Sequence, residues 1–427
     1  MTMPCWLGEL VTGRWVRISG DHPDLNFPVT PMGTRYLQDG DPALDGSLNP
    51  PRGLEMNLRR LARRYIKAPW SGRCDFRSIT EAWNGAVFAD RYGESGAMIV
   101  FGGGHDDYFG SDVHAFDLAT RQWKRISDGY VSGQPGAYGQ GADYPDAVYP
   151  DGSPLPPHTY GYVQYDPLGN DYLLFKGQAE LGPDVRPTPI AHMFNLDTLT
   201  WRRGPKHESA TLNSGGWTTW DAARRILWGN SGADGNAFIG FSPDSGNDDG
   251  TFGSWGRLFP NKIPDAADHN AMAIDPLRDI IVVLVHGLNA LYAIDPAEPE
   301  KAIVRLSSCG SMPTIMPYSA IEYAPNLDAL IYYSANDGAK VYAIKAPTGS
   351  TWSQLTSRDW SWSNIRDPNI LEKGNGIDPI ADAAAASRHR VNRAHTFGRF
   401  RVATYGSADV AILVRHVDSP VYVMRLS

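Results

Sequence analysis

The stretch WNGAVFADRYGESGAMIVFGGGHDDYFGSDVHAFDLATRQWKRIS, Trp83–Ser127, decides the fold of this 427-residue chain. It divides into four short strands, WNGAVFA, AMIVFGGG, DVHAFDL and QWKRI, with turns rich in glycine and charged residues between them. The second strand is a continuous apolar run, as expected for a strand buried on both faces. The fourth strand carries Trp123, whose ring can cover the outer edge of the sheet. The unit therefore predicts one four-stranded antiparallel sheet.

The same pattern recurs along the chain. Further units begin at HTYGYVQYDPLGNDYLLFKG, GGWTTWDAARRILWGN, HNAMAIDPLRDIIVVLVHG and YSAIEYAPNLDALIYYS, and the fifth unit is expected to end in a strand at Trp352. The last unit, His395–Ser427, has only three strands, and GRWVRIS, Gly13–Ser19, matches QWKRIS of the first unit. Adding this N-terminal strand to the last sheet would close a ring and remove its exposed edges. The sequence thus predicts an all-β propeller of about six four-stranded blades, with room for a degenerate seventh between Asp21 and Ile79.

One domain is expected to span residues 1–427. Its parts are a closing strand at 13–19, an N-terminal extension at 20–80, five blades over 81–356, an insertion at 357–394 and the last blade at 395–427. The extension contains NLRRLARRYI, whose spacing predicts a short basic amphipathic helix.

The run GGGHDDYFGSDVHAFDLATRQW resembles the Gly-Gly, aromatic and tryptophan signature of Kelch repeats, the type found in the central domain of galactose oxidase. The likeness covers most of the chain at the level of blade pattern. It implies a Kelch-like β-propeller and leaves the function open, because one fold hosts many functions.

The composition and net charge of the chain argue against some classes of binding partner. A hydrophobic fraction of 42% is that of an ordinary soluble globular protein, and a net charge of -8 argues against nucleic-acid binding. No apolar run is long enough to span a membrane, and MTMPCWLGEL lacks the features of a signal peptide. A cytoplasmic location, a place on a larger particle and secretion after signal removal all stay open. The three cysteines, Cys5, Cys74 and Cys309, have neither disulfide-framework nor metal-ligand spacing.

Propeller topology predicts which residues share one end of the central channel. In an antiparallel blade, the residues just before strand one and just after strand two lie at the same end, which we call the mouth. The positions before strand one are Trp83, Asn84, His158, Tyr160, Trp217, His269, Asn270, Tyr318 and His395, and those after strand two include His105, Asp107, Tyr108, Lys176, Gln178 and His286. Five of the 11 histidines fall at these positions, which indicates a functional site. The alternative is that these side chains only bond to the backbone of the neighbouring blade.

The chemistry at the mouth suits β-elimination on an acidic, uronate-containing polysaccharide. Such a lyase removes the proton α to a carboxylate and protonates the leaving oxygen, tasks for tyrosine and histidine, while a cation stabilises the developing charge. The predicted catalytic residues are His105, His158, Tyr160 and Lys176. The arrangement resembles that of propeller polysaccharide lyases of the ulvan type, which implies His, Tyr and a basic residue on neighbouring blades. The predicted substrate-binding residues are Trp83, Asn84, Tyr108, Gln178, Trp217, His269, Asn270, His286, Tyr318, Arg393 and His395.

Two alternatives remain. The first is a non-catalytic propeller that binds a glycan or a protein, as an appendage of a larger particle or alone; Trp360 and Trp362 of the insertion would then help to stack on sugar rings. The second is a divalent metal at the mouth, with His105 and Asp107 as candidate ligands, although the lyase hypothesis requires no cofactor. The copper chemistry of galactose oxidase is not expected, since no cysteine lies at a predicted mouth position.

Overall fold

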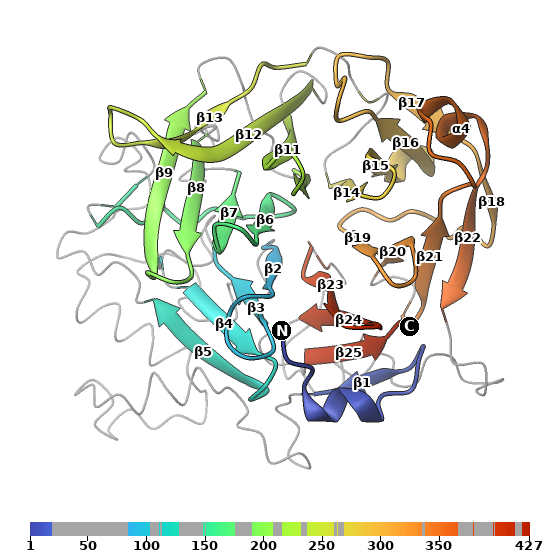
Figure 1. The fold of residues 1–427 in the computed structure, drawn as a ribbon, viewed down its shortest axis with the longest axis horizontal. Coiled ribbons are helices and arrows are strands. Elements are labelled where there is room, and N and C mark those ends of the chain that lie inside the picture. The colour runs from blue at the N-terminus through green and yellow to red at the C-terminus, as the bar shows by residue number, and fades with distance from the viewer. Residues whose placement is uncertain are drawn as a thin grey trace.

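A computed structural model describes residues 1–18, 84–102, 111, 113–127, 148–149, 151–175, 190–207, 216–231, 237–259, 263, 269–334, 338–365, 379, 396, 398–414 and 421–427. The described strands form six sheets arranged around a common centre (Figure 1). The chain is therefore a six-bladed β-propeller, and the prediction of an all-β fold with six four-stranded blades is confirmed. The predicted basic helix and the seventh blade lie outside the described residues.

The first three blades follow one another along the chain. Blade 1 is β2 (Ala86–Ala89), β3 (Ala97–Val100), β4 (Val113–Asp117) and β5 (Gln122–Ser127). Blade 2 is β6 (Val163–Asp166), β7 (Asp171–Leu174), β8 (Ile190–Asn195) and β9 (Thr200–Lys206). Blade 3 is β10 (Thr218–Asp221), β11 (Ile226–Ser231), β12 (Ala237–Gly246) and β13 (Phe252–Trp255). In each blade the first strand lies nearest the centre of the ring (Figure 1).

The remaining blades carry small additions. Blade 4 is β14 (Ala271–Asp275), β15 (Ile280–Val285), β16 (Ala290–Ile294) and β17 (Val304–Leu306), with the 3-10 helix η4 (His286–Leu288) after β15. Blade 5 is β19 (Ala320–Ala324), β20 (Ala329–Tyr333), β21 (Val341–Lys345) and β22 (Trp360–Ile365), and β18 (Ser308–Gly310) pairs in parallel with the outer edge of β22. Blade 6 is β23 (Phe400–Tyr405), β24 (Ala408–Val414), β25 (Val421–Arg425) and β1 (Trp15–Arg17).

The ring closes through the N-terminal strand. β1 follows the 3-10 helix η1 (Cys5–Glu9) and pairs antiparallel with β25, Val16 opposite Val423. In Figure 1 the blue N-terminal segment lies beside the red C-terminal strands. The Trp15 ring is fully buried against Tyr333 and Phe400 of blades 5 and 6. The first and last parts of the chain thus share one sheet, as the match of GRWVRIS to QWKRIS predicts.

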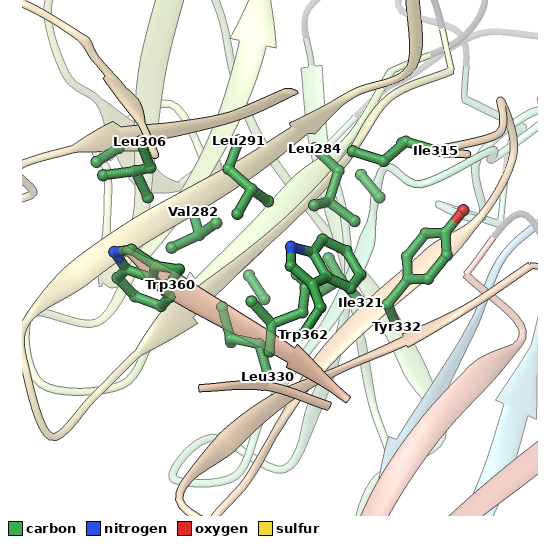
Figure 2. Close-up of a cluster of buried hydrophobic side chains, with 14 of the residues drawn as sticks. Val282, Leu284, Leu291, Leu306, Ile315, Ile321, Leu330, Tyr332, Trp360 and Trp362 are labelled. Atoms are coloured by element: carbon green, nitrogen blue, oxygen red, sulfur yellow. The ribbon is translucent and has the colours of Figure 1, made fainter. Parts of the chain in front are cut away.

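The predicted end of blade 5 is wrong. Trp352 begins a short helix, α4 (Trp352–Ser357), whose N-terminus is closed by a capping box between Thr351 and Gln354. The fourth strand is instead β22, which falls in the stretch assigned to the insertion. Trp360 and Trp362 of β22 are 0% and 3% exposed and lie in a core shared by blades 4 and 5 (Figure 2). Because that core buries them, these two rings cannot stack on a sugar.

Arginine–aspartate pairs join neighbouring blades at the turns between strand one and strand two. Arg225 of blade 3 contacts Asp166 of blade 2 at 2.5 Å, and Arg278 of blade 4 contacts Asp328 of blade 5 at 2.6 Å. Arg224 contacts both Asp221 of its own blade and Asp279 of blade 4. These turns lie at the end of the channel opposite the mouth, so the pairs fix the blades to one another there.

A buried histidine in blade 2 makes the stability of the folded protein depend on pH in the acid range. His192 of β8 is fully buried, and within the described part of the chain neither of its ring nitrogens has a hydrogen-bond partner. Burial, and secondarily the charge of Arg203, lower the pKa of His192 to about 3. The folded protein therefore keeps this ring neutral, whereas the unfolded chain takes up a proton below about pH 6.5.

We expect His192→Leu to remove part of the acid sensitivity. Between about pH 6.5 and pH 3 the wild type should lose stability relative to the variant by up to about 1.4 kcal/mol per pH unit, because only its unfolded state binds the extra proton. Near pH 8 the variant should be no less stable, since an unsatisfied polar group leaves the core. Urea unfolding of both proteins at pH 5, 6 and 8 measures the difference. A difference that does not change with pH would contradict the assignment.

Candidate functional site

Five of the predicted mouth residues line one pocket. Before strand one of blades 2 to 5 the chain places Tyr160, Trp217, His269, Asn270 and Tyr318 around a cavity of about 40 Å³. This volume holds a few water molecules at most, because one water needs roughly 10–15 Å³ of such space. A group as large as a sugar ring therefore cannot be enclosed by this pocket.

The aromatic side chains of the mouth form a continuous row in which each ring contacts the next. The ring of His158 lies edge-on to that of Tyr160, which is 5.3 Å from the ring of His269. The His269 ring is in turn 4.0 Å from that of Tyr318. His269 and Tyr318 are partly exposed, whereas His158 is fully buried and Tyr160 is 6% exposed. A ligand at the mouth would meet His269 and Tyr318 first, and His158 could act only through Tyr160.

Tyr160 and His158 form a polar pair. The Tyr160 Oη lies 3.4 Å from Nδ1 of His158. A phenol and an imidazole in this contact can pass a proton between them when a reacting group approaches the phenol oxygen. The pair therefore has the residue types that general acid–base chemistry needs.

The backbone at the mouth is held in an unusual conformation. Tyr160, His269 and Tyr318 have φ values of 45°, 70° and 60°, in the left-handed region that non-glycine residues rarely adopt. Backbone hydrogen bonds between blades support it: the N–H of Tyr318 donates to the carbonyl of His269 at 3.0 Å, and that of Thr396 donates to the carbonyl of Tyr318 at 3.1 Å. Strained backbone of this kind concentrates at functional sites.

Other predicted residues have structural contacts. Asn84 is fully buried, and its Oδ1 accepts the backbone N–H of Thr159, which joins blades 1 and 2. The Oδ1 of Asn270 accepts the backbone N–H of His286, and His286 is not among the residues that line the pocket. Trp217 is 1% exposed and packs in a core with Trp228 and Phe238, so its ring face is not open to a sugar.

The blades approach each other too closely at this end for a side chain on Gly102. This residue has a φ of 119°, and a Cβ there would come within 2.6 Å of the Asn84 Oδ1 and 2.8 Å of the Pro157 carbonyl. The absence of a side chain at Gly102 thus permits the contact between blades 1 and 2.

Several predicted residues lie outside the described part of the chain. They are Trp83, His105, Asp107, Tyr108, Lys176, Gln178, Arg393 and His395. Two of the four predicted catalytic residues, His105 and Lys176, and both candidate metal ligands are among them. Among the residues that are described, no group of three or more His, Cys, Asp or Glu side chains is arranged to hold a metal ion. No described helix has the length and apolar character needed to cross a membrane.

The floor of the pocket is a buried ion pair that sequence analysis missed. Arg401 of β23 donates through Nε to the carbonyl of Ala86 at 2.7 Å and through a terminal nitrogen to the carbonyl of Val163 at 2.9 Å. Its other terminal nitrogen binds the carboxylate of Glu322 in blade 5. One side chain thus joins four blades across the channel. The signal was a charge in each of two otherwise apolar first strands, FRVATY and AIEYA.

The fold and the site together define a six-bladed β-propeller whose channel has a mouth lined by histidine and tyrosine. No protein-family model matches the chain, and no curated protein sequence does so either. Among solved structures, it is similar to the major allergen Mala s 1 of Malassezia sympodialis at 9% identity, over 81% of this chain and 93% of that one, with a TM-score of 0.43. It is also similar to a chain of a nidogen/laminin complex at 13% identity, over 61% of this chain and 75% of that one, with a TM-score of 0.35. The fold assignment rests on the sheet pairing and not on these distant likenesses.

Proposed function

We propose that this protein is a Kelch-like, carbohydrate-active propeller that cleaves an acidic, uronate-containing polysaccharide by β-elimination at the mouth. The observation that supports this most is the contact of Tyr160 with His158, beside the partly exposed His269. It supplies two side chains that can transfer a proton, next to a histidine that is partly exposed.

The proposed elimination removes a proton from one carbon of the uronate ring and releases the glycosidic oxygen from the adjacent carbon. The Tyr160 oxygen takes the proton α to the carboxylate as its own proton passes to His158. The electron pair left behind forms a carbon–carbon double bond, and the glycosidic oxygen leaves with a proton from His269 or from His105. Lys176 would balance the charge that develops on the carboxylate.

The decisive assay is the appearance of unsaturated uronate, followed by its ultraviolet absorbance, with a panel of uronate polymers. With a polymer that is cleaved, Tyr160→Phe should slow turnover by about 100-fold or more, the usual contribution of a general acid or base. Its melting temperature should change little, because only the hydroxyl is lost. Asp248→Asn, an exposed change in blade 3, is the matched control and should keep full activity.

The alternative is a propeller that binds glycans without chemistry. The specific observation in its favour is the small pocket volume, about 40 Å³, beside a partly exposed pair of rings, His269 and Tyr318. Glycan-array binding without unsaturated product from any polymer, and unchanged binding by Tyr160→Phe, would favour it and would exclude the lyase proposal.

A further inference from the structure

A second and larger cavity lies at the other end of the channel. We call it the lower cavity; it has a volume of about 380 Å³, within the range of roughly 300–1,000 Å³ typical of small-molecule sites. It is lined by the ends of the first strands, where the Arg–Asp pairs join the blades. Gln164, Glu322 and Arg401 line both this cavity and the mouth pocket, so the ion pair lies between the two.

One acid that lines the lower cavity has no ion-pair partner among the described residues. Of its four acidic lining residues, Asp221 and Asp279 bind Arg224, and Glu322 binds Arg401. The fourth is Asp90, which makes no ion pair with any residue in the described ranges, and its Oδ1 has no hydrogen-bond partner there. Burial, followed by the charge of Asp90, raises the pKa of both Tyr165 and Tyr405 above the usual range. The Asp90 carboxylate is therefore close enough to both hydroxyl groups for its charge to act on them.

Aromatic rings from four blades line the same cavity. Phe88, Tyr165, Trp220 and Tyr323 come from blades 1, 2, 3 and 5, and Met272 and Ile274 of blade 4 add apolar surface between them. The face of an aromatic ring attracts a cation, most strongly when water is excluded. Aromatic residues beside a carboxylate are the features that recognise an organic cation.

We infer that the lower cavity is a second binding site, for a small organic ammonium ion whose charged nitrogen lies near Asp90 and whose carbon groups contact the aromatic walls. The inference is independent of the chemistry proposed for the mouth. An acidic ligand fits less well, because four of the five charged side chains in the lining are acidic.

The test compares n-butylammonium with n-butanol, which has nearly the same shape and no charge, by titration calorimetry at low salt. We expect the ammonium to bind at least about tenfold more tightly, a difference of about 1.4 kcal/mol. Asp90→Asn should remove that preference. Asp248→Asn changes the net charge of the protein equally, but far from the cavity lining, and should leave both affinities unchanged.

A second variant keeps the test decisive if Asp90→Asn does not fold, which thermal melts will reveal. Phe88→Leu keeps an apolar side chain and removes the aromatic face, so it should weaken tetramethylammonium binding severalfold and leave n-butanol unaffected. Equal affinity for n-butanol and n-butylammonium would overturn the inference. So would tetramethylammonium binding that Phe88→Leu leaves unchanged.

Discussion

Replacing Trp15 by alanine is expected to lower the free energy of unfolding by about 3–5 kcal/mol, the usual loss when a fully buried tryptophan is truncated. The ring of Trp15 fills the space between blades 5 and 6, with its centroid 5.6 Å from that of Tyr333. Its indole N–H donates to the carbonyl of Ala339 at 2.9 Å. Because this one residue anchors β1, its loss should weaken the closure of the ring as well as the local core.

Chemical denaturation gives the total loss, and hydrogen exchange shows where it acts. The amides of β25 bond to β1 and should lose protection more than those of β15 in blade 4. Arg14→Ala, the exposed neighbour of Trp15, is the matched control and should change the free energy of unfolding by less than about 0.5 kcal/mol. A loss below 1 kcal/mol for Trp15→Ala would mean that β1 does not close the ring.

Replacing Arg401 by methionine should be similarly costly. The change keeps an unbranched, uncharged side chain in place of the arginine stem but leaves the Glu322 carboxylate and the carbonyls of Ala86 and Val163 without their donor. Breaking a buried ion pair by removing one partner lowers stability by about 3–5 kcal/mol, because a charge stays behind without compensation. Arg401 is 7% exposed and Glu322 25%, and that exposure is to the channel, so solvent screens the pair only in part.

The double variant Arg401→Met/Glu322→Leu shows how much of the lost stability comes from the uncompensated charge and how much from packing. Because it removes both charges, it should recover about 2 kcal/mol or more of the loss, even though the two carbonyls stay unsatisfied. The pH dependence gives a second check. Burial raises the pKa of Glu322, against the opposing effect of Arg401, so without Arg401 the pKa should rise further.

An acid with a raised pKa in the folded state binds protons that the unfolded state has released, so stability falls as the pH rises through the gap between the two pKa values. The defect of Arg401→Met should therefore be smaller at pH 5 than at pH 8. Equal defects at the two pH values, or a single variant as stable as the wild type, would show that the pair does not hold the channel together.

Much of the fold could be predicted because each blade is built from neighbouring segments of the chain. The apolar run IIVVLV is β15, buried along its whole length, as its pattern predicts. The prediction for the end of blade 5 is wrong because a tryptophan after a turn can begin a helix as well as a strand. The sequence TWSQ of residues 351–354 is a capping-box pattern and could have identified α4.

For the candidate site, strand topology predicts only which residues share one end of the channel. Antiparallel alternation brings Tyr160, His269 and Tyr318 to one end of the channel, whatever the packing. Alternation does not specify which of these side chains is exposed. That His158 and Trp217 are buried depends on how closely neighbouring blades approach, and this was not apparent from their positions in the sequence.

The six repeated sheets and the N-terminal strand that completes the last of them could be predicted, because strand order and apolar pattern are local properties of the chain. Only the tertiary structure decided what lies inside the ring. The ion pair of Arg401 with Glu322, the narrow mouth and the lower cavity are all formed by first strands of different blades. Those strands are far apart in the chain, and the radius of the closed ring sets which of their side chains meet.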